Sequence, residues 1–366
     1  MKTKLLLICL SLLSLGMTDA IRQITPINAI FVGNNKGGTV SIIDADKLEV
    51  VSTINIIPDK AKANTKAYKQ RLINKYVNKK LGPKYVDDLD ILPDGQTMVV
   101  SRPYFSDIAA FDLNTQKMLW RLPLGHRPDH QVMTKDGKYL FVSLLVSKKG
   151  MKIDLENQKI VGTYKTGKRP HSIVLNQAET RLYNGSLNGN DIVVIDTETL
   201  KQVDRYTFPE GVRPFKLSVD EKKIYLQLSF YHGIAEYDME KRQIIREIDM
   251  PIPDFVKSIK LKDYPFLAAH HGIGWSSDKQ YMSVAATVSN YVGILSFPDL
   301  KLLKTFDAGI EPSWITDGFD VDTFFVSSRG SDKVFVYSYS KQELLKTIEV
   351  GDYPQRMNRA VWMKKN

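Results

Sequence analysis

Short runs of alternating apolar and polar residues follow one another along almost the whole chain. Residues 169–208 contain four such runs, HSIVL, RLYNGS, DIVVID and QVDRYTF, with turn-forming residues such as Asn188-Gly189 between them. A period of two is typical of half-buried β-strands, and Asn-Gly pairs favour tight turns. We therefore predict that this segment forms one four-stranded unit.

The same four-strand pattern recurs along the chain, and no segment within the repeats keeps a helical period for long. Six complete units run from Tyr85 to Gly351, and the two ends of the chain supply a seventh. Residues 29–56 carry its last three strands, and residues 355–363 carry the missing inner strand. The prediction is an all-β, seven-bladed β-propeller of four-stranded blades, closed by the C-terminal strand joining the N-terminal blade. Closure removes the exposed sheet edges that would otherwise favour aggregation.

Several strings resemble the repeat of a known family. IFVGNNKGGTVSIIDADKLEVVSTI, DGKYLFVS and NDIVVIDTETLKQVDRY are similar to the YVTN-type (YncE-like) repeat of exported seven-bladed propellers. Ile43-Asp44 and Ile195-Asp196 match its V-I-D strand, and residues 141–143 stand at the name-giving tetrapeptide. The resemblance covers essentially the whole chain after residue 20 and implies the fold rather than an activity. More distant relatives that it implies are the propeller that holds d1-type haem and the lactonase propellers.

Two segments depart from the repeat pattern, and a third precedes it. Residues 1–20 have lysines ahead of an apolar run and end in small residues, as in a secretory signal peptide. Residues 21–366 are then one propeller domain, periplasmic or secreted, and not an integral membrane protein after cleavage. Residues 59–84 carry nine basic residues from Lys60 onward, with apolar residues at helical spacing, and predict an inserted basic helix. Residues 251–269 form a longer crossover, expected to be a lid or rim loop.

The charge and the cysteine content of the chain limit the kinds of ligand and catalytic site that it can have. The only cysteine, Cys9, lies in the signal segment, so the mature chain has no disulfide, thiol nucleophile or thiolate metal site. The net charge of the full chain is +10, which favours anionic ligands or surfaces. In an exported protein this does not indicate nucleic acid. The sequence also lacks a GxSxG elbow, a P-loop and a Rossmann glycine motif.

The strongest candidate site comes from aligning the repeats. In a propeller the loops that enter the inner strands converge at one mouth of the central channel. Five of the six histidines fall in these loops, and Asp87 and Asp88 join them. The predicted ligand-binding residues are His126, Arg127, Asp129, His130, Arg169, His171, Arg213, His270, His271, Trp314 and Arg356.

Two kinds of ligand suit this set of residues. His130, His171 and His271 could bind a divalent metal ion or supply an axial ligand to a haem-type cofactor. Arg127, Arg169 and Arg213, with Arg356, could instead hold a flat anionic molecule, although each arginine could equally brace neighbouring loops. His270 precedes His271, yet the repeat pattern makes residues 272–275 an ordinary inner strand.

These observations favour a binding or scaffold protein that holds an anionic ligand, metal or metallocofactor at the channel mouth. One alternative is an enzyme, either a lactonase-like hydrolase or a metal- or haem-dependent redox protein. The other is a protein-interaction platform that uses the rim loops or the basic segment 59–84 to bind a partner. The identity of the cofactor is open at this point.

Overall fold

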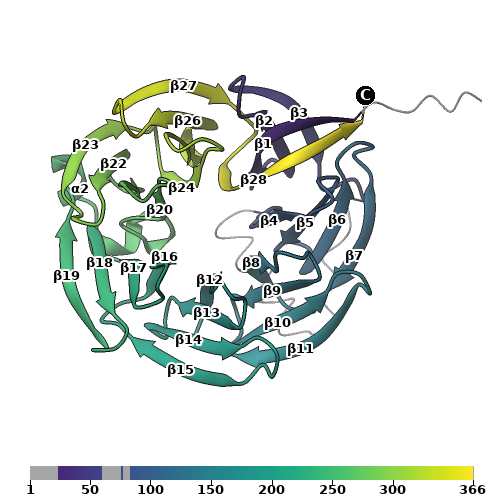
Figure 1. The fold of residues 1–366 in the computed structure, drawn as a ribbon, viewed down its shortest axis with the longest axis horizontal. Helices are drawn as coiled ribbons and strands as arrows, with labels where there is room; N and C mark the ends of the chain where they lie inside the picture. Colours follow the sequence, from purple (N-terminus) through teal and green to yellow (C-terminus); the bar gives the residue numbers. More distant parts are fainter. Residues whose placement is uncertain (1–23, 60–75, 77–82, 366) are drawn as a thin grey trace, which may run out of the picture.

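The computed structural model of the protein describes residues 24–59, 76 and 83–365. Seven four-stranded antiparallel sheets are arranged in a ring around a central axis (Figure 1). The predicted seven-bladed propeller is confirmed, because each sequence repeat forms one sheet. In each blade one strand lies nearest the axis, and the others follow outward in order.

Six of the blades are each built from four strands that are consecutive in the sequence, and the first of these blades follows residue 83. It contains β4 (Leu89–Ile91), β5 (Thr97–Arg102), β6 (Asp107–Asp112) and β7 (Met118–Pro123). The next contains β8 (Pro128–Met133), β9 (Tyr139–Leu144), β10 (Lys149–Asp154) and β11 (Lys159–Lys165). The third contains β12 (Pro170–Leu175), β13 (Arg181–Ser186), β14 (Asp191–Asp196) and β15 (Gln202–Thr207).

The remaining three consecutive blades follow the same plan. They contain β16 (Val212–Leu217), β17 (Lys223–Leu228), β18 (Gly233–Asp238) and β19 (Gln243–Asp249); β20 (Gly272–Trp275), β21 (Tyr281–Ala286), β22 (Tyr291–Ser296) and β23 (Leu302–Asp307); and β24 (Pro312–Asp317), β25 (Thr323–Ser328), β26 (Lys333–Ser338) and β27 (Glu343–Glu349).

The seventh blade joins the two ends of the described chain. Strand β28 (Pro354–Lys365) pairs antiparallel with β1 (Ile24–Asn34), and β1 continues the sheet to β2 (Thr39–Asp44) and β3 (Glu49–Asn55). The pairing runs from Ile24 opposite Lys365 to Asn34 opposite Pro354 (Figure 1). This pairing of the C-terminal and N-terminal strands closes the ring as the sequence predicts, so β1 does not present a free edge.

The hydrophobic core lies between neighbouring blades. One cluster joins Phe31 of β1, Phe111 of β6 and Trp362 of β28, all of them buried. Similar clusters occupy the spaces between the other blades, where the apolar faces of adjacent sheets meet. Because every sheet is covered by apolar side chains of its neighbours, the blades form a rigid frame around the axis.

Tight turns complete the blades, and one of them requires glycine. Gly95 follows Asp94, whose carboxylate accepts hydrogen bonds from the backbone N–H groups of Gln96 and Thr97. The φ angle of Gly95 is +63°, and a Cβ atom there would lie 2.6 Å from the carbonyl oxygen of Val361. Glycine at this turn thus allows the first blade after residue 83 to pack against β28.

The long crossover after β19 is compact. It contains α2 (Asp254–Lys257), η1 (Leu261–Asp263) and η2 (Pro265–Leu267), and a further short helix, η3 (Arg329–Ser331), follows β25. The predicted signal peptide lies outside the described residues, as does nearly all of the predicted basic helix. No helix in the described part of the chain is long and apolar enough to cross a membrane.

Candidate metal centre at the propeller axis

Three of the predicted histidines meet at the axis. His130 lies on β8, His171 on β12, and His271 directly precedes β20. At most 5% of each residue is exposed, and one ring nitrogen from each can be chosen so that all lie within 4.8 Å of one another. Three imidazoles from three blades therefore share one buried space.

The contact between His171 and His271 is the most informative in this space. Their Nε2 atoms are 3.0 Å apart. The Nδ1 atom of His171 is 2.5 Å from a carboxylate oxygen of Asp129, and that of His271 is 3.3 Å from the backbone carbonyl oxygen of Ser313. Both acceptors favour a proton on Nδ1, and a neutral imidazole carries only one. Both Nε2 atoms then present lone pairs to each other.

A proton shared between these lone pairs is disfavoured by the surroundings. Burial lowers the pKa of His171 and of His271 well below the ordinary value, and the nearby Arg213 guanidinium lowers both further. Burial, with Arg356 nearby, also lowers the pKa of His130, whose Nε2 atom has no hydrogen-bond partner among the described residues. The neutral rings leave nitrogen lone pairs that a metal cation would satisfy.

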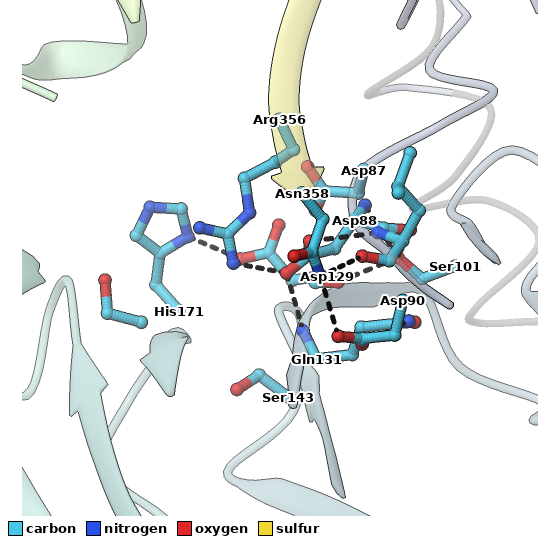
Figure 2. Close-up of polar contacts among 12 residues, drawn as sticks. Asp87, Asp88, Asp90, Ser101, Asp129, Gln131, Ser143, His171, Arg356 and Asn358 are labelled. Carbon is cyan, nitrogen blue, oxygen red and sulfur yellow. Dashed lines mark hydrogen bonds and ion pairs between the residues drawn. The ribbon is translucent and has the colours of Figure 1, made fainter. Parts of the chain in front are cut away.

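Several carboxylates lie on one side of His171, among them Asp87, Asp88 and Asp129 (Figure 2). Asp129 points toward His171, and Asp87 lies close enough to form a second possible ligand group with Asp129 and His130. Lys84 Nζ is 2.5 Å from an Asp87 oxygen and 3.8 Å from an Asp129 oxygen. Burial, reinforced by Asp129 and opposed by Lys84, raises the pKa of Asp87 to about 7.

A second group of buried polar residues lies beside the histidines, and its charges pair with each other. Arg356 forms an ion pair with Asp88, and its guanidinium lies 3.6 Å from the ring centre of Trp314. Asp88 also accepts a hydrogen bond from the backbone N–H of Gln131 at 3.0 Å, which joins β28 to β8 (Figure 2). Arg356 is therefore already neutralised by a buried carboxylate.

The remaining predicted residues do not join this cluster. Arg169 is exposed and contacts Asn188, and the partly exposed His126 lies near Lys149 instead. Arg127 is buried, and burial lowers its pKa although Asp87 and Asp129 oppose the shift. Arg127 therefore lies near the Asp87 and Asp129 carboxylates, whereas the contacts of Arg169 and His126 are with other residues.

His270 and His271 are adjacent but occupy different surroundings. The ring of His270 neighbours those of His232 and Tyr291, and its two nitrogens have no hydrogen-bond partner among the described residues. Burial lowers the pKa of His270 to about 3. His271 alone of the two reaches His171, as its repeat position predicts.

Comparison with known proteins agrees with this architecture. Residues 107–260 match the family of YNCE-like beta-propellers. The resemblance noted from the repeats is thereby confirmed over several blades. A search of curated proteins found no significant match to this chain.

Solved structures show the same fold at low sequence identity. Hydrazine synthase of Kuenenia stuttgartiensis has 15% identity and a TM-score of 0.61, covering 74% of this chain and 88% of that one. Dihydro-heme d1 dehydrogenase NirN in complex with DHE has 12% identity and a TM-score of 0.59, covering 92% and 76%. A chain of the mitotic checkpoint complex has 14% identity and a TM-score of 0.59, covering 74% and 79%. At this identity the similarity shows the fold alone.

Sequence reasoning missed two residues that lie beside the histidines of this propeller. Phe266, in the crossover loop, has its ring centre 6.3 Å from that of His271, and the buried guanidinium of Arg329 lies 3.5 Å from the Phe266 ring centre. Arg213 donates hydrogen bonds to the backbone carbonyls of Phe266 and Leu267. Arg213 thus anchors the loop beside the site, and a lone arginine in a turn, such as Arg329, has no sequence signature.

Proposed function

We propose that this exported propeller binds one divalent transition-metal ion through His130, His171 and His271. The observation that carries the proposal is the pair of facing Nε2 atoms, each on a ring whose Nδ1 is held by an acceptor. In metal sites a ligating histidine commonly donates its other N–H to a carboxylate or carbonyl in this way. Asp129 and the Ser313 carbonyl supply those two acceptors.

The donor set indicates which ions fit. Neutral imidazole nitrogens suit zinc, copper, iron and nickel, whereas calcium and magnesium prefer oxygen ligands. Three protein ligands leave at least one coordination position for water or another ligand, as in open zinc sites. Small movements of the rings toward the metal would bring the three nitrogens into bonding distance, because His171 and His271 now lie about as far apart as two ligands of one ion.

A haem-type cofactor does not fit the same three histidines. An imidazole that binds haem iron axially must have the macrocycle spread across its Nε2 side. Here His271 Nε2 lies 3.0 Å from His171 Nε2, and His130 belongs to the same group. These rings occupy the space that a macrocycle would need, so a single ion is favoured over haem.

Metal analysis of purified protein tests the proposal. After treatment with EDTA, the protein is titrated with Co²⁺ or Zn²⁺, and bound metal is measured by mass spectrometry and by the visible absorption of Co²⁺. We expect one ion per chain. His171→Ala should abolish binding, whereas the control variants His126→Ala and His232→Ala should retain it, because neither residue belongs to the group.

Two results would contradict the proposal. The first is a wild-type protein that retains neither ion at micromolar concentration. The second is equal binding by His171→Ala and His126→Ala. Circular dichroism of each variant separates loss of the site from loss of the fold.

A further inference from the structure

A cavity of about 440 Å³ lies between the inner strands of several blades, and His130 lines it. It follows the inner strands from Ser172 to Gln177 and from Pro214 to Val219, away from the mouth where His171 and His271 meet. His130, Trp314 and Arg356 line the end nearest the histidines. The volume is in the range of cavities that hold small molecules.

The walls of this cavity are largely apolar. Ile173, Phe215, Leu217, Ile273 and Ile315 come from four successive inner strands and all line it, together with the indole of Trp275. Ile173, Phe215, Ile273 and Ile315 are also members of the hydrophobic clusters between the blades, and each contributes part of its surface to the cavity wall. Such a surface favours the apolar, flat part of a ligand, because burying it removes apolar area from water.

The far end of the cavity carries positive charge. Lys216 and Lys279 both line it, with their Nζ atoms 5.3 Å and 4.2 Å from the ring centre of Trp275. Lys216 has a carboxylate partner, Asp317, at 3.7 Å. No carboxylate of the described residues lies within ion-pair distance of Lys279. Glu221 is the only acidic side chain among the lining residues, and it accepts a hydrogen bond from an asparagine.

We propose that this cavity binds a small organic anion with a flat apolar body, whose carboxylate pairs with Lys279 and Lys216 while the body packs against Phe215 and Ile273. An apolar cavity whose far end carries an ammonium group without a carboxylate partner among the described residues matches this ligand in both shape and charge. The proposed metal ligand His130 lines the near end of the cavity, but the carboxylate would pair with Lys279 and Lys216 at the far end, so the inference does not depend on the metal site.

The protonation of Lys279 gives the site a pH dependence. Burial and the neighbouring Lys216 lower the pKa of Lys279 to about 8, with Arg359 acting in the same direction. Asp317 and Asp278 oppose the shift. Lys279 is therefore charged at neutral pH and loses its charge as the pH rises through about 8, so anion binding should weaken over that interval.

Calorimetric titration of the EDTA-treated protein with 2-naphthoate tests the proposal. The neutral analogue 2-naphthamide has the same ring system without the charge. We expect naphthoate to bind about fivefold more tightly than naphthamide, the size of one partly exposed ion pair. Lys279→Gln should remove this preference, and the control Lys159→Gln, an exposed lysine on β11, should keep it. Wild-type affinity for naphthoate should fall between about pH 7 and about pH 9, while that for naphthamide stays constant.

Two results of the naphthoate titration would overturn the proposed anion site. Absence of naphthoate binding at millimolar concentration, or equal affinity for both compounds, overturns the proposal. A preference for naphthoate that survives in Lys279→Gln and at high pH also overturns it, because another residue would then bind the carboxylate. His171→Ala should retain naphthoate binding, so failure of the metal proposal and failure of this one can be told apart.

Discussion

The carboxylate of Asp129 should control the metal affinity of the proposed site without binding the metal itself. It lies 2.5 Å from His171 Nδ1, and only 2% of its side chain is exposed. This contact fixes the ring orientation and places the proton on Nδ1, which directs the Nε2 lone pair toward His271. In Asp129→Asn the amide has nearly the same shape but no charge.

The magnitude follows from what the substitution removes. A buried hydrogen bond to a charged group contributes about 2 kcal/mol, and a neutral one about 1 kcal/mol. An amide oxygen in the place of the carboxylate would keep the weaker bond only if it faces His171. The metal affinity should thus fall by about fivefold if it does, and by about thirtyfold if the amide nitrogen faces the ring instead and the whole bond is lost.

The assay is a competition between the protein and a chromophoric zinc chelator at about pH 7.5. The control is Asp136→Asn, which removes a carboxylate of the same blade that contacts Thr134 and none of the three histidines. We expect Asp136→Asn to match the wild type within about twofold, a difference well below 1 kcal/mol. If Asp129→Asn also matches the wild type, Asp129 does not support a metal ligand and the reasoning from facing lone pairs fails.

Three further predictions concern the free energy of unfolding, measured by urea titration. Arg102→Met should lower it by about 3 kcal/mol, because buried Asp107 would lose a two-point partner and keep only Arg121; an unchanged value would show that the pair contributes no net stability. Burial and a neighbouring carboxylate raise the pKa of Asp90 to about 7. As the pH falls below about 7, the folded state therefore binds this proton before the unfolded state does, and the free energy of unfolding of the wild type should rise by about 1 kcal/mol per pH unit. Asp90→Asn should therefore be the more stable protein at about pH 8 and lose this advantage toward about pH 5, and parallel pH profiles would contradict the assignment. Gly95→Ala should cost about 2 kcal/mol, since a Cβ would meet backbone in the final strand at a positive φ, and no loss would mean that the turn can relax.

The blades could be predicted because their signals are local. Alternation with a period of two and the turn residues between runs identify strands within about forty residues, and their recurrence gives the number of blades. The odd strand at each end of the sequence then indicated closure, which the pairing of β28 with β1 confirms. The approximate level of each histidine along the axis followed from the same repeat register.

The meeting of the ring nitrogens could not be predicted in this way. Pairing between β8 and β9 shifts register between Pro128 and Gln131, and pairing between β12 and β13 shifts between Pro170 and Ile173. His130 and His171 both lie inside these irregular segments. A bulge changes the direction of a side chain without leaving a clear sequence signal. The directions of these two rings are therefore properties of the folded blades.

The amino-acid sequence by itself determined a closed seven-bladed propeller and placed histidines from three separate repeats at one level of its axis. Tertiary structure decided that His271 reaches His171 whereas His270 turns toward His232, that Arg356 is neutralised by Asp88, and that Phe266 lies beside His271. Strand periodicity acts over a few residues and is written in the local sequence. Contacts between blades, such as that between Asp88 and Arg356, join residues as distant as 268 positions in the sequence, and they depend on bulges, ion pairs and loop packing that exist only once the ring is closed.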